Sequence, residues 1–311
     1  MPSRIHVIVN PAAGRGAPIL HILNSVFRPS GIIWDVSVTL RSGDAARFAT
    51  RAVSAGVDVV AAYGGDGTVM EVAGSLAGTP TPLAILPGGT ANLMATELGI
   101  PRNLTSAARI AAREDSVPRV VDLGTAGDRR FMLRVGVGFE ARKVEATSRE
   151  MKERFGVLAY SLGALQALRT SGPARFRFSL DGQEEECDAI ACVVDNAGSI
   201  GIPGLSHSPL VSVSDGFFDV FALRDLHGLL PGSPTRRAAA AQGPRAGTEI
   251  AQHWRARHIT IVTDPPLPVQ ADGEMWGTTP ISIDVLPGAV RVLTKPSPQA
   301  VSVRDPARTS A

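Results

Sequence analysis

Apolar and polar residues alternate along the first hundred residues in a pattern that predicts strands followed by helices. Apolar runs of strand length lie at 5–9, 32–40, 57–62 and 83–86. After the first run, Ile19, Leu23 and Phe27 follow helical spacing, and Ser42 is placed to cap a helix that ends near Gly56. Repeated strand–helix units of this length predict an α/β domain with a parallel sheet and helices on both faces.

From about Pro118 the pattern changes to short alternating runs bounded by turns, which favours antiparallel strands. These runs lie at 120–123, 131–137, 175–180, 190–194, 217–223, 259–263 and 281–286. Asp181-Gly182 is typical of a hairpin turn, and one amphipathic helix is predicted around 155–168. The second half is therefore predicted to be a mostly antiparallel β-sandwich.

Composition limits the classes of partner. The 311 residues are enough for two domains, and 44% are apolar, which permits a sizeable core. A net charge of +2 argues against nucleic acid as a partner. Cys187 and Cys192 alternate with apolar residues, so we predict half-buried strand positions rather than a disulfide framework or a metal site.

The chain shows no targeting or spanning segment. Its start lacks the apolar stretch of a signal peptide, and no segment approaches the roughly 20 apolar residues that span a bilayer. We expect a cytoplasmic protein that is at most peripheral at the inner membrane surface. Segment 231–247, rich in Pro, Ala, Gly and Arg, is predicted to be a mobile surface insertion, and the tail after Lys295 has too few apolar residues to pack.

The most informative motif is Gly64-Gly65-Asp66-Gly67-Thr68, which follows a buried strand and precedes a helix. Ligands of open parallel sheets bind at the carboxyl ends of strands, where such turns lie. Consecutive glycines let the backbone approach a phosphate, and a helix N-terminus favours its negative charge. The carboxylate of Asp66 suits Mg²⁺ or a reacting hydroxyl instead. An ordinary tight turn with a Thr68–Glu71 capping box is the alternative.

Two further glycine turns follow predicted strands in the same way. Pro87-Gly88-Gly89-Thr90-Ala91-Asn92 follows the strand at 83–86, and Asn10-Pro11-Ala12-Ala13-Gly14 follows the strand at 5–9. Taken alone, Thr90 could be a helix N-cap. Turns on successive parallel strands would lie side by side, which is the arrangement that a triphosphate needs. P-loop and protein-kinase signatures are missing from the sequence, and no G-x-G-x-x-G follows the first strand.

These motifs resemble the diacylglycerol kinase catalytic family, and in particular the soluble bacterial lipid kinases related to it. The similarity covers most of the chain, because Asn10-Pro11 with Gly14, then 64–71, then 86–95 appear in the family's order. Segment 136–141 is similar to a glycine-rich segment at the head of the family's second domain, although Glu140 stands where most members have aspartate.

The resemblance implies the NAD kinase/diacylglycerol kinase-like fold and a division of the chain. The implied parts are a nucleotide-binding domain at 1–118 with a return strand at about 288–296, a β-sandwich lipid-substrate domain at 119–287, and a disordered tail at 297–311.

Two later motifs extend the resemblance. Asp215-Gly216-Phe217-Phe218-Asp219-Val220 resembles the family's DG-x-x-D-V segment, which implies a structural Mg²⁺ held by Asp215 and by backbone carbonyls near Ser212 and Phe217. Ser214 departs from the second acid that many members carry, and a plain hairpin turn is the alternative. Asp272-Gly273-Glu274 matches the family's late DGE motif, which implies a loop that reaches across the cleft and completes the active site.

The resemblance implies an ATP-dependent lipid kinase that uses Mg²⁺ and phosphorylates a hydroxyl of diacylglycerol or a related lipid at the membrane surface. The residues assigned to ATP are Asn10, Gly14, Thr39, Gly64, Gly65, Gly67, Thr68, Glu71, Gly89, Thr90 and Asn92. The catalytic candidates are Asp66, Asp272 and Glu274. Asp66 and Glu274 would organise Mg²⁺ and water at the γ-phosphate. Which of the three carboxylates takes the proton from the lipid stays open.

The lipid is expected to enter between the domains. The predicted helix at 155–168 follows Lys152 and Arg154 and carries a leucine face that suits anionic lipid, although core packing explains the same face. His207 and His253 are expected to be bystanders. NAD phosphorylation, a 6-phosphofructokinase activity and a non-catalytic nucleotide or lipid sensor are the alternatives. The identity of the lipid and the oligomeric state, a homodimer included, stay open.

Overall fold

The computed structural model of the chain describes residues 2–14, 16–113, 116–138, 173–198, 211–224 and 251–296. Several sequence predictions fall outside these residues: the helix at 155–168 with Lys152 and Arg154, the insertion at 231–247, the tail at 297–311, Glu140 and His207.

The N-terminal part is an α/β unit with parallel strands in the order β2-β1-β3-β4. Its strands are β1 (Arg4–Val9), β2 (Ile33–Val38), β3 (Val59–Gly64) and β4 (Leu83–Pro87). Its helices are α1 (Ile19–Phe27), α2 (Asp44–Ser54), α3 (Asp66–Leu76), α4 (Leu93–Glu97) and α5 (Leu104–Ala112). The chain runs one way from β1 to β2 and the other way from β2 through β3 to β4. Right-handed crossovers therefore place α1 on one face of the sheet and α2 and α3 on the other.

The second part is a β-sandwich. Its strands are β5 (Val117–Ala126), β6 (Arg129–Phe131), β7 (Arg134–Val137), β8 (Ala174–Leu180), β9 (Gln183–Ala189), β10 (Ala191–Asp195), β11 (Phe218–Leu223), β12 (Ala251–Ala256), β13 (His258–Asp264), β14 (Pro268–Ala271), β15 (Glu274–Thr278) and β16 (Ile281–Thr294). One layer is a six-stranded sheet in the order β12-β11-β10-β7-β14-β15, here called sheet B. Buried residues of both layers, such as Phe178 and Val220, form one core. The predicted fold class is confirmed.

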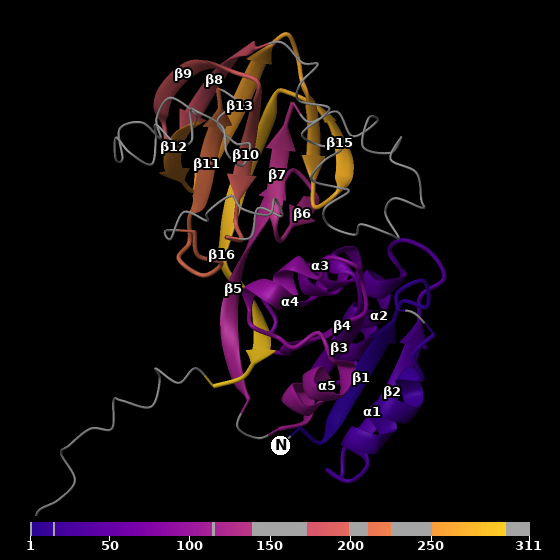
Figure 1. The fold of residues 1–311 in the computed structure, drawn as a ribbon. Coiled ribbons are helices and arrows are strands. Elements are labelled where there is room, and N and C mark those ends of the chain that lie inside the picture. The colour runs from indigo at the N-terminus through magenta and orange to yellow at the C-terminus, as the bar shows by residue number, and fades with distance from the viewer. Residues whose placement is uncertain are drawn as a thin grey trace, which may run out of the picture.

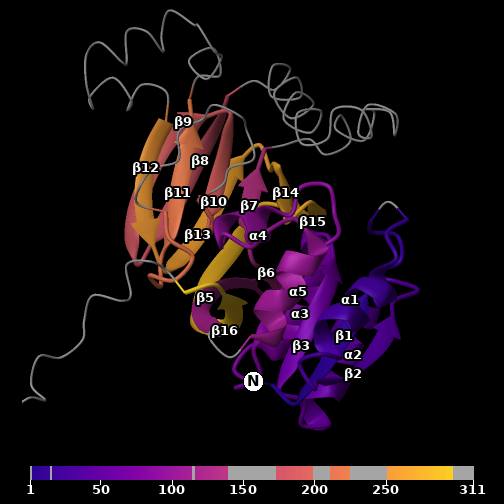
Figure 2. The ribbon, with the colours of Figure 1, turned by 60° about the horizontal axis from the view of Figure 1, so that its bottom comes forward.

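A two-stranded ribbon of β5 and β16 joins the two parts. Near its start β16 pairs with β13, and near its end Val292 pairs in parallel with Leu83 of β4. β5 runs antiparallel to β16 along both portions, with a bulge between Leu286 and Val290. Figures 1 and 2 show this ribbon running from the lower α/β part into the upper sandwich. One ten-stranded sheet thus continues from the parallel sheet into a layer of the sandwich. The run predicted at 281–286 and the return strand predicted at about 288–296 are one strand, β16.

Two local predictions about helix caps are wrong. The N-cap of α2 is Gly43 in a left-handed conformation rather than Ser42, and the N-cap of α4 is Asn92 rather than Thr90. In α2 the exposed N–H groups are instead bound by a carboxylate from another helix, as described below. The hairpin at Asp181-Gly182 is confirmed, since both residues have positive φ and join β8 to β9. Cys187 and Cys192 lie on strands, as predicted, but both are buried rather than half-buried.

Asp122 fixes the ribbon to its surroundings. This β5 residue is 2% exposed, and its two carboxylate oxygens accept N–H bonds from Gly288 and Gly216, both at 2.7 Å. Its own N–H donates to Val213 O at 2.7 Å. A single buried carboxylate therefore ties the β16 bulge and the loop before β11 to β5.

We predict that Asp122→Ala lowers the free energy of unfolding by about 2–4 kcal/mol, because two N–H groups lose a charged acceptor. Urea unfolding measures the change. Asp128→Ala, in the exposed turn between β5 and β6, is the matched control and is expected to change stability by less than about 0.5 kcal/mol. Equal stability of the two variants would show that Asp122 does not anchor the ribbon.

Candidate active site

The three glycine turns lie at the carboxyl ends of β1, β3 and β4, which are neighbours in the sheet. Two of them are in direct contact. The N–H groups of Gly88 and Gly89 both donate to Gly64 O, at 2.9 and 3.1 Å. A Cβ on Gly89 would lie 2.5 Å from the Cα of Gly65, so no side chain fits between the turns. The expectation that these turns lie side by side is confirmed.

Tyr63, which was not predicted as a site residue, lies next to all three turns. It is 2% exposed, and its backbone O accepts the N–H of Asn10 at 2.9 Å. A Cβ on Gly14 would lie 2.1 Å from its hydroxyl, and a Cβ on Gly88 would lie 2.8 Å from its ring. Burial raises the pKa of the Tyr63 phenol. The glycines are therefore needed here for close packing as well as for access to a ligand.

Side chains of the turns bind mainly to one another. Asn10 Nδ2 donates to Thr68 Oγ1 at 3.0 Å, which links the first turn to α3. Asn92, with a φ of 50°, exchanges two hydrogen bonds with the backbone of Gly89, at 2.7 and 2.9 Å. Thr90 is exposed, and Thr39 is 8% exposed at the end of β2. Asn92 thus closes its turn, whereas Thr90 stays accessible to a ligand.

The N-terminus of α3 directly follows the Gly64–Gly65 turn, which is one of the two turns in contact. Its N-cap is Gly65, and no side chain caps its first N–H groups. The alternative interpretation of this motif, an ordinary turn with a Thr68–Glu71 capping box, is therefore wrong about the cap. Asp66 begins the helix, and its Oδ1 accepts the N–H of Met94 on α4 at 3.2 Å. This contact leaves Oδ2 for another partner.

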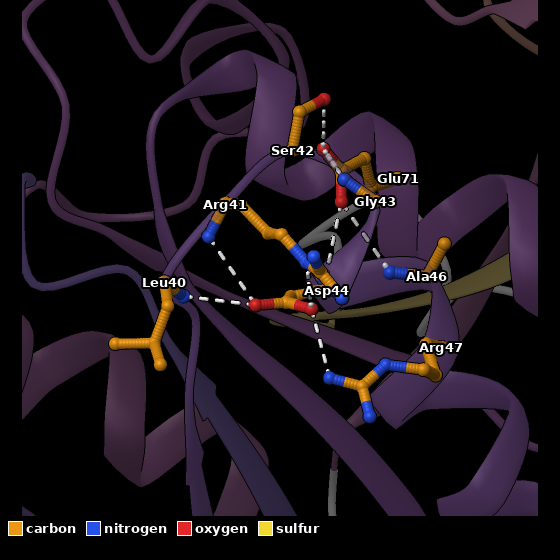
Figure 3. A network of polar contacts seen from close by, with 9 residues as sticks. Leu40, Arg41, Ser42, Gly43, Asp44, Ala46, Arg47 and Glu71 are labelled. Carbon is orange, nitrogen blue, oxygen red and sulfur yellow. Dashed lines mark hydrogen bonds and ion pairs between the residues drawn. The ribbon is translucent and has the colours of Figure 1, made fainter.

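Glu71 lies on α3, but its carboxylate binds the start of α2 (Figure 3). It accepts N–H bonds from Gly43, Ala45 and Ala46 at 3.0–3.4 Å. Its assignment to ATP stays a prediction, and its observed contacts are with the protein.

Asp44, at the same helix start, folds back onto the segment after β2. It accepts the N–H groups of Leu40 and Arg41, at 3.0 and 3.2 Å, and pairs with Arg47 at 2.8 Å (Figure 3). The bond from Leu40 and the pairing with Arg47 lower the pKa of Asp44 to about 2. Together Asp44 and Glu71 hold the segment that follows Thr39 beside the carboxyl edge of the parallel sheet.

The two carboxylates of the DGE motif have different surroundings. Asp272 accepts three successive backbone N–H groups, from Met132, Leu133 and Arg134, at 2.7–3.0 Å. Burial raises the pKa of Asp272 to about 6, although these donors favour its ionised form. Glu274 is the exposed first residue of β15. Asp272 therefore acts as an anchor for the turn, and Glu274 is the accessible carboxylate.

Residues 131–134 connect the DGE turn to both cores. Phe131 packs in the sandwich core, whereas Met132 and Leu133 pack in the core of the α/β part. Asn196, fully buried, donates from Nδ2 to Met132 O at 2.7 Å and to Asp122 O at 2.9 Å. The anchor of Asp272 is thus itself held at the junction of the two parts.

Two arginines of β6 connect the β14–β15 hairpin, which carries Glu274, to the α/β part. Arg130 donates to the backbone O of Gly74 in α3, and Arg129 donates to Met275 O in β15 at 3.4 Å. Arg129 also lies over the ring of Trp276, 5.7 Å from its centroid. The β14–β15 hairpin that carries Glu274 is therefore connected to α3, the helix that begins with Asp66.

At the place that the resemblance assigned to a structural Mg²⁺, the Asp215 carboxylate is already bound by protein groups. Asp215 Oδ1 accepts the N–H of Phe217 at 3.1 Å, and its Oδ2 pairs with Arg255 at 2.5 Å. The assignment of Asp215 and of backbone carbonyls near Ser212 and Phe217 to this ion stays a prediction. Within the described part of the chain, no three His, Cys, Asp or Glu side chains are grouped as metal ligands.

Two smaller sequence predictions also find their outcome here. His253, which was expected to be a bystander, lies with its Nε2 2.6 Å from Asp219 Oδ1. No helix among the described residues combines the length and the apolar character needed to cross a membrane.

Two family models match the chain. The model described as the diacylglycerol kinase catalytic domain matches residues 4–126, and the YegS C-terminal NAD kinase beta sandwich-like domain matches residues 134–294. A protein of Pseudomonas putida named probable lipid kinase YegS-like is 31% identical over 267 residues, which cover 85% of this chain and 86% of that protein. An uncharacterized protein of Synechocystis is 32% identical over 240 residues, which cover 76% of this chain and 55% of that protein.

The fold is also similar to solved structures. A crystal structure described as a diacylglycerol kinase from Bacillus anthracis superposes with a TM-score of 0.74 at 28% identity, covering 96% of this chain and 99% of that one. The similarity includes both the α/β part and the sandwich.

We predict that Gly89→Ala separates the two turns and lowers the unfolding midpoint by about 4–10 °C, because a methyl group has no space against Gly65. Gly67→Ala is the control, since a Cβ there meets no atom within 4 Å. It is expected to shift the midpoint by less than about 2 °C. Thermal unfolding measures both, and an undisturbed Gly89→Ala protein would contradict the contact.

Proposed function

Because the chain belongs to the diacylglycerol kinase catalytic-domain family, we propose that it is an ATP-dependent lipid kinase that transfers the γ-phosphoryl group to a hydroxyl of diacylglycerol or a related lipid. The observation that carries this proposal is the contact between the turns at Gly64–Gly65 and Gly88–Gly89 below the uncapped start of α3. Backbone N–H groups at a helix N-terminus favour phosphate oxygens, and the glycines leave room for them.

The bound triphosphate would lie along the two paired glycine turns and the start of α3. Gly65, Gly67 and Thr68 belong to the cap and first turn of α3, and Thr90 is exposed on the neighbouring turn. Asp66 would hold Mg²⁺ through Oδ2 together with phosphate and water oxygens, and the ion would neutralise charge on the transferred group. The bond from Met94 to Oδ1 orients this carboxylate.

We assign the general base to Glu274. It is exposed, and its hairpin is braced against α3 by Arg129 and Arg130. The carboxylate would accept the hydroxyl proton of the lipid as the hydroxyl oxygen bonds to the γ-phosphorus and ADP departs. A weak base that is well placed suffices when the proton leaves late in a loose transition state. Asp272 is a positioning residue in this scheme, because its oxygens are bound to three backbone N–H groups.

The lipid acceptor would approach from the membrane surface, with the chain remaining a cytoplasmic, peripheral protein. The apolar tail would stay in the lipid phase or between the two domains, while the hydroxyl reaches Glu274. This location is testable by sedimentation of the protein with vesicles.

The activity is tested by incubating the purified chain with radiolabelled ATP, Mg²⁺ and a detergent-dispersed total lipid extract, with NAD in a parallel tube. We expect label in a lipid of the organic phase and none with an Asp66→Ala variant. Chromatography of the labelled lipid would then identify the acceptor. Label in NAD alone, or in neither acceptor, would contradict a lipid kinase.

The base assignment predicts different behaviour for the two DGE carboxylates. Glu274→Gln is expected to lower kcat by about 10²–10⁴-fold with little change in the KM for ATP. Its unfolding free energy should change by less than about 0.5 kcal/mol, because the side chain is exposed. Asp272→Asn should lose about 1–3 kcal/mol of stability, because an amide cannot accept all three N–H bonds. A fully active Glu274→Gln enzyme would exclude Glu274 as the base.

A further inference from the structure

A row of charged residues crosses sheet B on the face opposite the sandwich core. In strand register, Asp195 lies opposite Arg134 on one side and Asp219 on the other, and Asp219 lies opposite Arg255. The adjacent Val194 and Val220 point into the core instead. Cross-strand partners share a face of the sheet, with Cβ atoms about 4.5–5.5 Å apart. The row therefore places two carboxylates between two guanidinium groups, and its formal charges balance.

Arg255 joins the two aspartates of the DG-x-x-D segment. Its Nη2 donates to Asp215 Oδ2 at 2.5 Å, and its Nε lies 3.8 Å from Asp219 Oδ1. Its guanidinium lies over the ring of Phe217, 4.8 Å from the centroid. One cation thus contacts both acids and the aromatic ring between them.

A divalent cation would have to compete with Arg255 and with other protein groups for the carboxylate oxygens at this place. Asp215 Oδ1 is occupied by the N–H of Phe217, and Asp219 Oδ1 is occupied by His253 as well as facing Arg255. Mg²⁺ requires a near-octahedral set of oxygens at about 2.1 Å. The strand register keeps the backbone of Arg255 opposite Asp219, and its guanidinium Nε lies 3.8 Å from Asp219 Oδ1. A second cation at this place would therefore meet repulsion, in a site where Asp219 is 1% exposed.

We infer that Arg255 takes the place of a structural divalent cation, so that a guanidinium holds the DG-x-x-D segment in this chain without Mg²⁺. This inference concerns how the fold is held and is independent of the proposed kinase activity. The segment is coupled to the domain junction, because Gly216 donates its N–H to Asp122 on β5. Arg255 therefore stabilises a loop that contacts the ribbon between the two domains, and any Mg²⁺ requirement belongs to the nucleotide site.

The first test is thermal unfolding of the full chain without nucleotide, with and without millimolar Mg²⁺ at constant ionic strength. The wild-type chain and an Asp215→Asn variant are expected to show the same Mg²⁺ response, within about 1 °C of each other. Because Asp215→Asn changes only the place beside Arg255, the comparison distinguishes Mg²⁺ bound at this place from Mg²⁺ bound at the nucleotide site. A saturable Mg²⁺-dependent rise of the wild-type midpoint that Asp215→Asn abolishes would overturn the inference.

The second test removes the arginine. Arg255→Ala is expected to lower the unfolding midpoint by about 5 °C or more, because Asp215 loses its guanidinium partner and Asp219 keeps only His253. Millimolar Mg²⁺ should restore part of this loss, since the vacated place then favours a cation. Arg257→Ala is the matched control: its guanidinium lies 4.4 Å from the Phe217 centroid, and its removal leaves both aspartates paired.

The control is expected to lose about 2 °C at most and to show no Mg²⁺ response beyond that of the wild type. Equal losses in the two arginine variants would overturn the inference. So would an Arg255→Ala chain that Mg²⁺ does not stabilise, because the arginine would then not be standing in for a metal ion.

Discussion

At the carboxyl edge of the parallel sheet, two backbone segments approach so closely that no side chain can lie between them. A Cβ on Gly89 would lie 2.5 Å from the Cα of Gly65, and the N–H groups of Gly88 and Gly89 converge on Gly64 O. The turns after β3 and β4 therefore form one rim, onto which the uncapped start of α3 opens. Other contacts stabilise this geometry: Tyr63 packs beneath it, Asn92 closes the second turn, and Asp66 connects α3 to α4.

The second half of the site depends on contacts between the two domains. Asp272 binds the N–H groups of residues 132–134, a segment that packs in the core of the α/β part and is held by Asn196. Arg130 connects β6 to α3, and Arg129 connects β6 to β15. Because these contacts act on the backbone around Glu274, the position of this carboxylate is set by packing at the junction more than by its own turn.

The sequence predicted features that follow from local rules. Strand–helix alternation located the parallel sheet, and the glycine turns could be assigned to one edge because parallel strands end together. Local rules do not predict contacts between residues that lie far apart in the sequence. Glu71 binds the start of α2, 25–28 residues away, so the cap assigned to Ser42 was wrong.

The same limit applies to the later motifs. The donors to Asp272 lie 138–140 residues away, and the pairing of Arg255 with Asp215 spans 40 residues. The family resemblance identified both motifs without these partners. It therefore could not separate the anchoring role of Asp272 from the role proposed for Glu274, and it did not indicate that Arg255 pairs with Asp215.

We propose that the apposed turns at Gly64–Gly65 and Gly88–Gly89 bind the phosphates of the nucleotide. A crystal structure with Mg²⁺ and a non-hydrolysable ATP analogue would test this proposal most directly. We expect phosphate oxygens within hydrogen-bonding distance of the N–H groups at the start of α3 and of the turn at Gly89, with Mg²⁺ near Asp66. A triphosphate bound elsewhere in the molecule, with both turns unoccupied, would contradict it.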